Sequence, residues 1–385
     1  MIICGNVNIE RFFIMRRKNR KKNIVLTILN TILVSLLSIC AVAGGIYCAK
    51  IYTTPYSNEI VASFDDDTLH NVSIKKEKYN ILITGTDKSG MLTDVLMLAQ
   101  IDPVDNKAVV MSIPRDTWVK YRGRSSKITE VYSAFYNKKE KTGIEDTILA
   151  VRELTDIPIH HFVKVNTKAF RQCIDELGGV DFDVPQNMRY NDPAQDLYIN
   201  LKKGQQHLDG DKAEQLVRFR HYPNGDIGRI EVQQTFLHAL AQQKLKPKYV
   251  GKIDDIYSIV IKNIETSMSP DDFVECGSQL LEIGTENIET ITLPHAFVNG
   301  ASYVKPVSTE IANIRRNAFG YTVAKFKYDG KVSKVFLSSG KTLKKEDFPK
   351  AAEKEGYDII WEPGAGTEIP ADTDMTVTGT YVRKN

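Results

Sequence analysis

Short apolar runs alternate with longer segments of helical periodicity along the central part of the chain. The runs are broken by Gly, Asp and Pro and have the length of strands, whereas apolar residues at three- and four-residue spacing predict helices. The predicted strands are Tyr79–Gly85, Val95–Ile101, Ala108–Ile113, Phe162–Val165, Val180–Val184 and Asn287–Leu293, and the predicted helices are Ile144–Leu154, Ala169–Leu177 and an amphipathic Ile227–Leu245. This alternation predicts an α/β domain with helices packed on a central sheet.

Two local signals mark a helix start and a hairpin. The sequence Ser269-Pro270-Asp271-Asp272 combines an N-cap serine, a proline at the first helical position and acids in the first turn, so a helix is expected to begin there. From Tyr321 onward, YTVAKFKYDGKVSKVFL alternates apolar and polar residues around Asp329-Gly330, a dipeptide typical of two-residue hairpin turns. With the closing run MTVTGTYV, this pattern predicts a separate small β-rich module at 320–385.

The longest apolar segment lies near the N-terminus. No residue from Ile24 to Ala49 is charged, and a 26-residue helix exceeds a hydrocarbon core of about 30 Å. Six Lys and Arg side chains precede it between positions 16 and 22, and such charges favour the cytoplasmic side. We therefore expect a cytoplasmic N-terminus at 1–23, a transmembrane anchor at 24–49 and a stalk at 50–75, with the main domain outside the cell.

A cleaved signal peptide is the alternative, because Ala41-Val42-Ala43 is a plausible cleavage site. The apolar run is much longer than the core of a signal peptide, which favours a single-pass anchor in the cell membrane. Met15 opens the sequence MRRKNRKK and is an alternative start to Met1. Whether the apolar segment is an anchor or a signal peptide, the main part of the protein is expected outside the cell.

Composition excludes two function classes. Apolar residues make up 42% of the chain and charged residues 26%, as in folded proteins. The net charge of +3 includes the basic N-terminal cluster, so the remainder is slightly acidic and a general nucleic-acid-coating surface is not indicated.

The five cysteines form no disulfide framework. Cys173 and Cys276 lie in the exported part, where they either pair or stay as isolated buried thiols, the second being favoured.

Two aspartates flank the loop between the first two predicted strands. Asp87 follows the first strand and Asp94 begins the second. One or two such carboxylates can hold a hard cation such as Mg²⁺ together with a phosphate substrate. Taken alone, loop aspartates are more often turn or cap residues.

Four arginines follow predicted elements in a pattern that favours an anionic partner. Arg115 and Asp116 come directly after a buried strand, where they form either a phosphate grip or a surface pair. Three more arginines fall within twelve residues, beside glycines and the start of a long helix, which allow close approach of an anion. Bidentate guanidinium groups suit a pyrophosphate with its metal. The residues of this second segment are Arg218, Arg220, Asp226, Arg229 and Gln233.

A lipid-linked ligand would also require an apolar cavity. The runs Phe162–Val165, Ile174–Leu177 and Phe236–Leu240 are candidates for its lining. Such residues are more often ordinary core, and the sequence does not separate the two roles.

At these clusters the chain resembles the LytR-CpsA-Psr (LCP) family of envelope phosphotransferases. The resemblance covers roughly residues 78–245 and weakens toward 315. It is specific because several motifs occur in order. They are YNILITGTD, TDVLMLAQIDPVDNKAVVMSIPRDTWV, KITEVY, HFVKVNTKAF, LGGVDFDVP, INLKKGQQHLDGDKAEQLVRFR and GDIGRIEVQQ. It implies an LCP-type domain at 76–318 with a central mixed β-sheet flanked by helices.

The resemblance also implies a function. The domain is expected to bind a polyprenyl pyrophosphate in a long apolar pocket and to transfer its glycopolymer, a teichoic acid, capsule or similar polymer, to a peptidoglycan hydroxyl. Asp87 and Asp94 would hold Mg²⁺, or Mn²⁺ in its place, and the arginines 115, 218, 220 and 229 would clamp the phosphates. Gln233 would support them, and Asp116 or Asp226 would act as a base or orient an arginine. A pyrophosphatase side activity follows from the same chemistry.

Other readings of the same residues remain. A non-catalytic receptor or regulator would use the arginines only to bind the lipid-linked glycan. Transcriptional control is disfavoured, because fewer than 25 residues precede the apolar segment and no basic recognition helix is present. The module at 320–385 is similar to small β-grasp-like repeats of bacterial surface proteins, which implies either wall or partner contact or a purely stabilising role.

Overall fold

The computed structural model describes residues 69, 74, 75, 77–86, 93–136, 143–193, 197–223, 225–246 and 264–384. All of them belong to one compact unit that spans 59–385. The expected N-terminus at 1–23, the anchor at 24–49 and nearly all of the stalk at 50–75 lie outside the described residues. Within the described part of the chain, no helix has the length and apolar character needed to cross a membrane.

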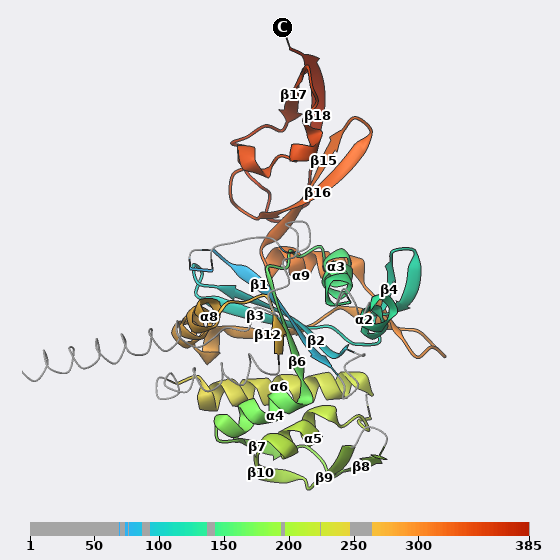
Figure 1. Cartoon of the computed structure of the whole chain (residues 1–385), viewed down its shortest axis with the longest axis vertical. Helices are drawn as coiled ribbons and strands as arrows, with labels where there is room; N and C mark the ends of the chain where they lie inside the picture. The colour runs from blue at the N-terminus through green and yellow to red at the C-terminus, as the bar shows by residue number, and fades with distance from the viewer. Residues whose placement is uncertain are drawn as a thin grey trace, which may run out of the picture. The chain divides into compact units, whose positions relative to one another are not determined.

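A six-stranded mixed sheet forms the centre of the protein, as expected (Figure 1). β1 pairs antiparallel with β2 and parallel with β6, while β3 pairs antiparallel with β2 and parallel with β12. The apolar runs of the sequence form these strands because both sheet faces are covered. In sheet order the strands are β11 (Ile264–Thr266), β6 (His161–Asn166), β1 (Tyr79–Thr86), β2 (Thr93–Asp102), β3 (Lys107–Ser112) and β12 (Ile288–Thr292).

One face of the sheet packs on α2 (Ile128–Phe135), α3 (Ile144–Thr155) and α9 (Ser308–Asn317). Alternate residues of the central strands, Leu82 and Leu98 among them, are fully buried against these helices. Phe162 belongs to this core and lines neither of the two cavities on the other face of the sheet. Its placement follows from the two-residue period of a strand, which sends Phe162 and Val163 to opposite faces.

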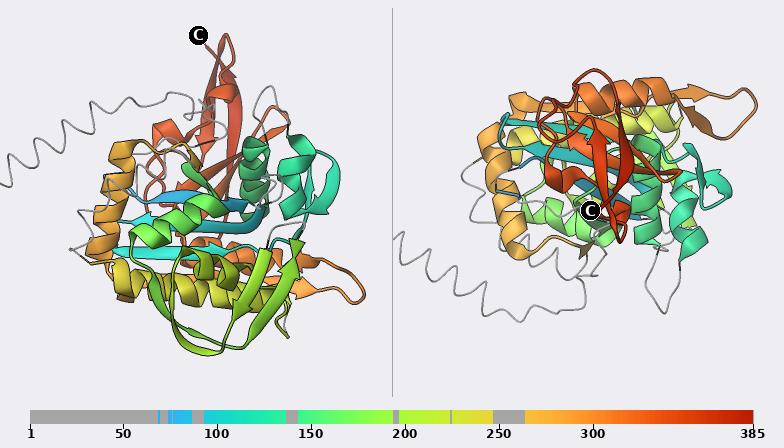
Figure 2. Two further views of the ribbon diagram at one scale, coloured as in Figure 1. Left: turned by 60° about the horizontal axis from the view of Figure 1, so that its bottom comes forward. Right: turned by 90° about the horizontal axis from the view of Figure 1, so that it is seen from above.

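The opposite face packs on α8 (Pro270–Ile283) and carries α6 (Asp226–Lys244) beneath it (Figures 1 and 2). Ser269 is the N-cap of α8 and forms a capping box with Asp272, which confirms the predicted helix start. The extent of α6 matches the prediction. The helix was also predicted to be amphipathic, with one apolar face, whereas it has apolar residues on two sides. Phe236 packs into a lobe on one side of the helix, while Leu237 and Ala241 face the sheet side. A helix between two apolar layers needs apolar residues on both.

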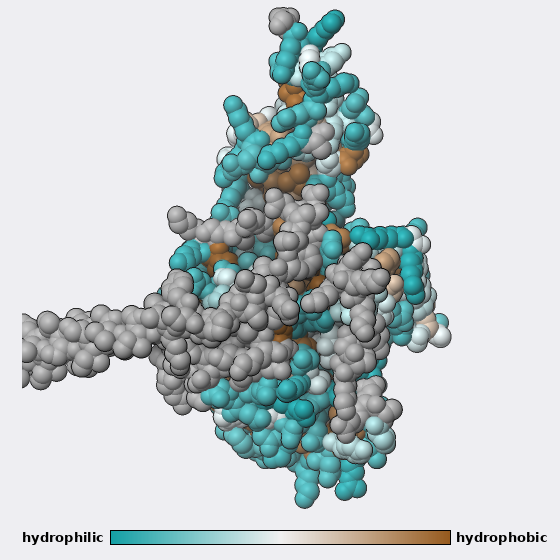
Figure 3. Space-filling view, in the orientation of Figure 1, coloured by the Kyte–Doolittle hydropathy of each residue, from teal (hydrophilic) through white to brown (hydrophobic). Residues whose placement is uncertain are grey.

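The lobe below α6 is built from two helices and two small antiparallel sheets, with its own core. Hydrophilic residues cover most of its visible surface, so its apolar residues are used in the interior (Figure 3). Ile174 lies in that core. The elements are α4 (Thr167–Glu176), β7 (Val180–Val184), β8 (Met188–Asp192), β9 (Leu197–Leu201), β10 (Gly204–Leu208) and α5 (Gly210–Arg218).

Two hairpins extend from the edge of the domain beside α2. β4 (Trp118–Tyr121) pairs with β5 (Arg124–Lys127), and β13 (His295–Phe297) pairs with β14 (Val304–Pro306). An isolated bridge between Thr117 and Val304 joins the two hairpins. The short 3₁₀ helix η3 (Thr285–Asn287) leads from α8 into β12.

The C-terminal residues form the expected β-rich module, with a sheet ordered β16-β15-β18-β17. Asp329 and Gly330 have positive φ values of 48° and 72°, as their hairpin turn requires. Phe326 lies in the module's own core, and the partly buried Trp361 packs against it. Its elements are β15 (Tyr321–Tyr328), β16 (Lys331–Ser338), η4 (Lys345–Asp347), η5 (Lys350–Ala352), β17 (Tyr357–Glu362) and β18 (Met375–Arg383).

Candidate functional site

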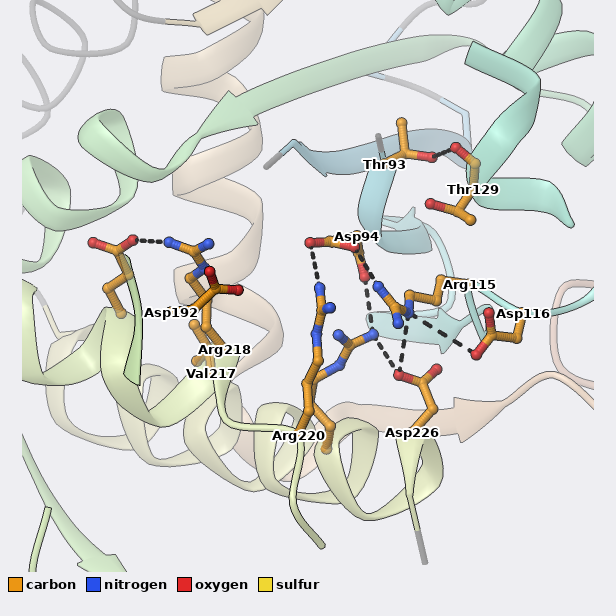
Figure 4. A network of polar contacts seen from close by, with 12 residues as sticks. Thr93, Asp94, Arg115, Asp116, Thr129, Asp192, Val217, Arg218, Arg220 and Asp226 are labelled. Atoms are coloured by element: carbon orange, nitrogen blue, oxygen red, sulfur yellow. Dashed lines mark hydrogen bonds and ion pairs between the residues drawn. The ribbon is translucent and has the colours of Figure 1, made fainter. Parts of the chain in front are cut away.

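Asp94, at the start of β2, is the point on which three arginines converge (Figure 4). One carboxylate oxygen accepts a hydrogen bond from Arg115 Nη1 at 2.7 Å, and the other accepts one from Arg220 Nη2 at 2.6 Å. Arg229 Nη2 donates to the Asp94 carbonyl oxygen at 3.1 Å. The structure thus brings together residues from four separate segments of the chain, three of them predicted as phosphate ligands and one as a metal ligand.

Backbone geometry holds each arginine where it lies. Arg115 follows β3 in a tight turn, in which Thr117 N donates to Pro114 O at 3.0 Å, and its own carbonyl oxygen accepts from Thr129 N at 3.1 Å. Arg220 follows α5, and Arg229 lies in the first turn of α6. Close packing of these two segments requires Gly228, because a Cβ atom there would lie 2.6 Å from Tyr222 Cβ.

Asp226 forms the second acidic position of the cluster. Its Oδ1 lies 2.5 Å from Arg229 Nη2 and 3.8 Å from Arg115 Nε. Its Oδ2 is buried and has no hydrogen-bond partner among the described residues. A buried carboxylate oxygen without a partner is costly, which makes this atom a natural acceptor for a bound ligand.

Burial affects the arginines differently. The Arg229 side chain is 3% exposed, and this burial lowers its pKa below the ordinary arginine value in spite of Asp226. Burial acts in the same sense on Arg115, but the charge of Asp94 and its hydrogen bond outweigh it and raise the pKa of Arg115. The positive charge of Arg229 is therefore less well compensated than that of Arg115, and an added anion would stabilise it.

Three predicted residues lie beside the cluster with other partners. Asp116 is 2.9 Å from Lys127 Nζ and 4.0 Å from Arg115 Nε. Arg218 Nη1 donates to Glu214 Oε1 at 2.7 Å, one turn earlier in α5. Gln233 Nε2 donates to the Val217 carbonyl oxygen at 2.9 Å, so it ties α6 to α5.

The arginine cluster forms one end of a long apolar cavity. The cavity next to it, about 900 Å³ with its open mouth, is lined by Asp94, Arg218, Arg220 and Arg229 and behind them by apolar residues such as Val165. A second cavity of about 1540 Å³ continues along the sheet toward Lys244 and Leu245. The two adjoin, because they share Ile83, Met97 and Leu237. The residues of the predicted lining that contact these cavities are Val165, Leu177, Phe236, Leu237, His238 and Leu240.

Of the two predicted metal ligands, Asp87 and Asp94, the structure describes only Asp94. Asp87 lies outside the described residues. The described residues contain no group of three His, Cys, Asp or Glu side chains arranged for a metal ion. Asp94 supplies carboxylate oxygens of the kind that Mg²⁺ prefers, and such sites need only one or two carboxylates when phosphates complete them. The donor type therefore fits, provided that a phosphate draws Arg115 and Arg220 away from Asp94.

Sequence reasoning missed Glu214 and Lys127. Glu214 is buried in the wall of the cavity, where its carboxylate lies 2.7 Å from Arg218 and 3.4 Å from Arg171. The four-residue spacing between Glu214 and Arg218 was a readable signal of that pair. The Lys127 contact depends on the β4–β5 register and had no local signal. Cys173 and Cys276 are unpaired thiols, as favoured from the sequence.

The chain is similar to known proteins in sequence. The model of the LytR_cpsA_psr family matches residues 47–319. The polyisoprenyl-teichoic acid–peptidoglycan teichoic acid transferase TagV of Bacillus subtilis is 29% identical over 243 residues, 61% of this chain and 61% of TagV. The enzyme of the same activity named TagU in Bacillus cereus is 29% identical over 249 residues, 61% of this chain and 78% of TagU. The match thus spans less than two thirds of TagV.

A solved structure shares the fold. The crystal structure of B. subtilis TagV superposes with a TM-score of 0.53 at 28% sequence identity, and the match covers 63% of this chain and 96% of the crystallised one.

Proposed function

Because the chain belongs to the LytR-CpsA-Psr family, we propose that it is a phosphotransferase that moves a glycopolymer from a polyprenyl pyrophosphate carrier to peptidoglycan. The observation that carries this proposal is the convergence of Arg115, Arg220 and Arg229 on Asp94 at one end of a long apolar cavity. A lipid pyrophosphate has the matching chemistry, an anionic head joined to an apolar chain. The printed activities of the relatives, teichoic acid transfer to peptidoglycan, support the same reaction.

The isoprenoid chain would lie in the cavity along the sheet, and its pyrophosphate would replace Asp94 as the partner of the arginines. A hydroxyl oxygen of the acceptor sugar attacks the phosphorus that bears the glycopolymer. A P–O bond forms to the acceptor, the bond to the second phosphate breaks, and polyprenyl phosphate leaves. The hydroxyl proton passes to a nearby carboxylate or to solvent, so charge and atoms balance.

The protein's part in this reaction is positioning and charge neutralisation. Asp94 holds the guanidinium groups of Arg115 and Arg220 close together, and the phosphates then replace Asp94 as their hydrogen-bond partner. Asp226 orients Arg229 and keeps a free oxygen at the site. Asp226 is therefore the better candidate for a base than Asp116, whose carboxylate is held by Lys127.

We further propose a divalent cation, Mg²⁺ or Mn²⁺, held by Asp94 and the substrate phosphates, with Asp87 as its second carboxylate. Such a cation would neutralise the charge of the diphosphate. In the absence of an acceptor, water in place of the sugar hydroxyl would give the pyrophosphatase side activity. The uncharged segment Ile24–Ala49 and the basic residues before it support a membrane-anchored protein whose main domain lies outside the cell.

The proposal is tested with the full chain in detergent, Mg²⁺, a polyprenyl-pyrophosphate-linked saccharide and uncrosslinked peptidoglycan strands. We expect transfer of the saccharide with its phosphate to the strands, detected by mass spectrometry, and its loss in Arg115→Ala. Arg189→Ala, an exposed arginine on β8, is the matched control and should keep full activity. Tight lipid binding without transfer or hydrolysis would refute the enzyme and leave a non-catalytic receptor for the lipid-linked glycan.

A further inference from the structure

An aromatic pair joins the two hairpins at the edge of the domain and does not line the cavity of the donor site. The rings of Trp118 and Tyr303 have centroids 4.5 Å apart and an angle of 30° between their planes. Both side chains are partly exposed. They come from different hairpins, Trp118 from β4 and Tyr303 from the residue before β14.

The strand register places Trp118 on the outer side of its hairpin. Val119 and Tyr121 are buried in the domain core, so Trp118 and Lys120, which alternate with them, face away from it. Trp118 is paired directly with Lys127 across the hairpin. The outer face therefore combines a flat aromatic surface with the Lys127–Asp116 ion pair at 2.9 Å.

Backbone hydrogen bonds fix this face relative to the phosphate site. Thr117 N donates to Pro114 O at 3.0 Å in the turn that carries Arg115, and Val304 N donates to Asp116 O at 3.0 Å. Trp118 is three residues from Arg115, and Tyr303 is adjacent to Val304. Asp116 lies beside Arg115 on the side opposite Arg220 (Figure 4). The two hairpins that carry the aromatic pair are thus tied by backbone hydrogen bonds to the turn that holds Arg115 and Asp116.

We propose that Trp118, Tyr303, Asp116 and Lys127 form the acceptor subsite, which binds a pyranose ring of the peptidoglycan glycan strand. This inference rests on the proposed transferase function. A pyranose has a C–H face that packs on an aromatic ring and hydroxyl and amide groups at its edge, and Trp and Tyr supply rigid contact area of that kind. Asp116 accepts hydrogen bonds from the sugar hydroxyls and Lys127 donates to its oxygens. The sugar hydroxyl is then presented to the phosphates at Arg115.

A purely structural reading is that the ring pair only joins the two hairpins. The two readings differ in kinetics. Loss of a joint between hairpins would disturb Arg115 and so change the donor KM and kcat, whereas loss of an acceptor subsite changes the acceptor KM alone.

The experiment uses the full chain in detergent with the lipid-linked saccharide donor and peptidoglycan strands of defined length. For Trp118→Ala and Tyr303→Ala we expect the acceptor KM to rise at least tenfold, with the donor KM within twofold of wild type. Trp118→Phe should recover most of the loss, because a flat ring remains. Hydrolysis of the donor by water, measured without strands, should be unchanged. Tyr198→Ala, an aromatic residue 57% exposed on β9, is the control and should leave both KM values unchanged.

The outcomes separate the two proposals. If wild type transfers no saccharide, the proposed function fails. If wild type transfers saccharide and both alanine variants keep the wild-type acceptor KM, or lose donor affinity and hydrolysis to the same extent as transfer, the acceptor subsite is refuted while the transferase stands.

Discussion

Replacement of Asp226 by Asn should destabilise the fold, because the buried guanidinium group of Arg229 then loses its charged partner. Arg229 is 3% exposed, and its Nη2 lies 2.5 Å from Asp226 Oδ1. Loss of one partner of a buried ion pair leaves an uncompensated charge and costs about 3–5 kcal/mol. Since Asp226 is 17% exposed and Arg229 keeps its bond to the Asp94 carbonyl oxygen, we expect the low end, about 3 kcal/mol.

The assay is thermal unfolding of the full chain followed by tryptophan fluorescence. The chain has two tryptophans, Trp118 beside the site and Trp361 in the C-terminal module. In a Trp361→Phe background the signal reports the domain that carries Asp226 and Arg229. The domain expected at 76–318 falls in the size range of about 150–250 residues, for which a loss of about 3 kcal/mol corresponds to a Tm about 6–12 °C lower. The matched control is Asp183→Asn, an exposed aspartate on β7, which should shift the Tm by less than 1 °C.

Two further measurements identify the cause. The double variant Asp226→Asn/Arg229→Met removes the buried charge and should be more stable than Asp226→Asn alone. Inorganic pyrophosphate should raise the Tm of Asp226→Asn more than that of wild type, because an anion supplies the missing charge. An unchanged Tm in Asp226→Asn, or a double variant less stable than the single one, would refute the reasoning.

Four other predictions follow from the site and its surroundings. Arg115→Lys should lower kcat/KM about 100-fold with an unchanged Tm, because the charge stays while the bidentate geometry is lost; full activity would contradict the phosphate clamp. Glu214→Gln should tighten binding of polyprenyl phosphate several-fold, because removal of a negative charge from the cavity wall is worth about 1 kcal/mol. A weaker affinity in this variant would contradict the placement of the phosphate beside Glu214. EDTA should abolish transfer and should weaken the binding of pyrophosphate measured by titration calorimetry, and addition of Mg²⁺ should restore both. Binding of pyrophosphate that does not depend on a metal would contradict the proposed cation. Burial lowers the pKa of Lys78 to about 8, so the folded state loses this proton at a lower pH than the unfolded state does. The free energy of unfolding should therefore rise from pH 8 to about 10.5, as measured by urea unfolding. The variant Lys78→Met should lack this rise, and a rise of equal size in the variant would contradict the assignment.

The sequence was sufficient for the elements whose signals are local. The bounds of α6 and the start of α8 at Ser269 were predicted closely, because caps and apolar spacing lie within a few residues of one another. The turn at Asp329-Gly330 is of the same kind, since its positive φ values depend on those two residues alone. The short hairpins β4–β5 and β13–β14 were not predicted. Their strands are three or four residues long, too short for a period to show.

Residue type alone also indicated an anionic ligand, because four arginines beside glycines and a helix start favour phosphate whatever the fold. The fold alone decided which of them meet. Arg115, Arg220 and Arg229 converge on Asp94 because β1 lies between β2 and β6 while α6 packs across the sheet, whereas Arg218, two residues from Arg220, pairs with Glu214. The contact of Trp118 with Tyr303 likewise depends on two hairpins joined through Thr117 and Val304. Periodicity and capping are short-range properties of the chain, but the distance between two charged groups is set by the packing of the layers that carry them.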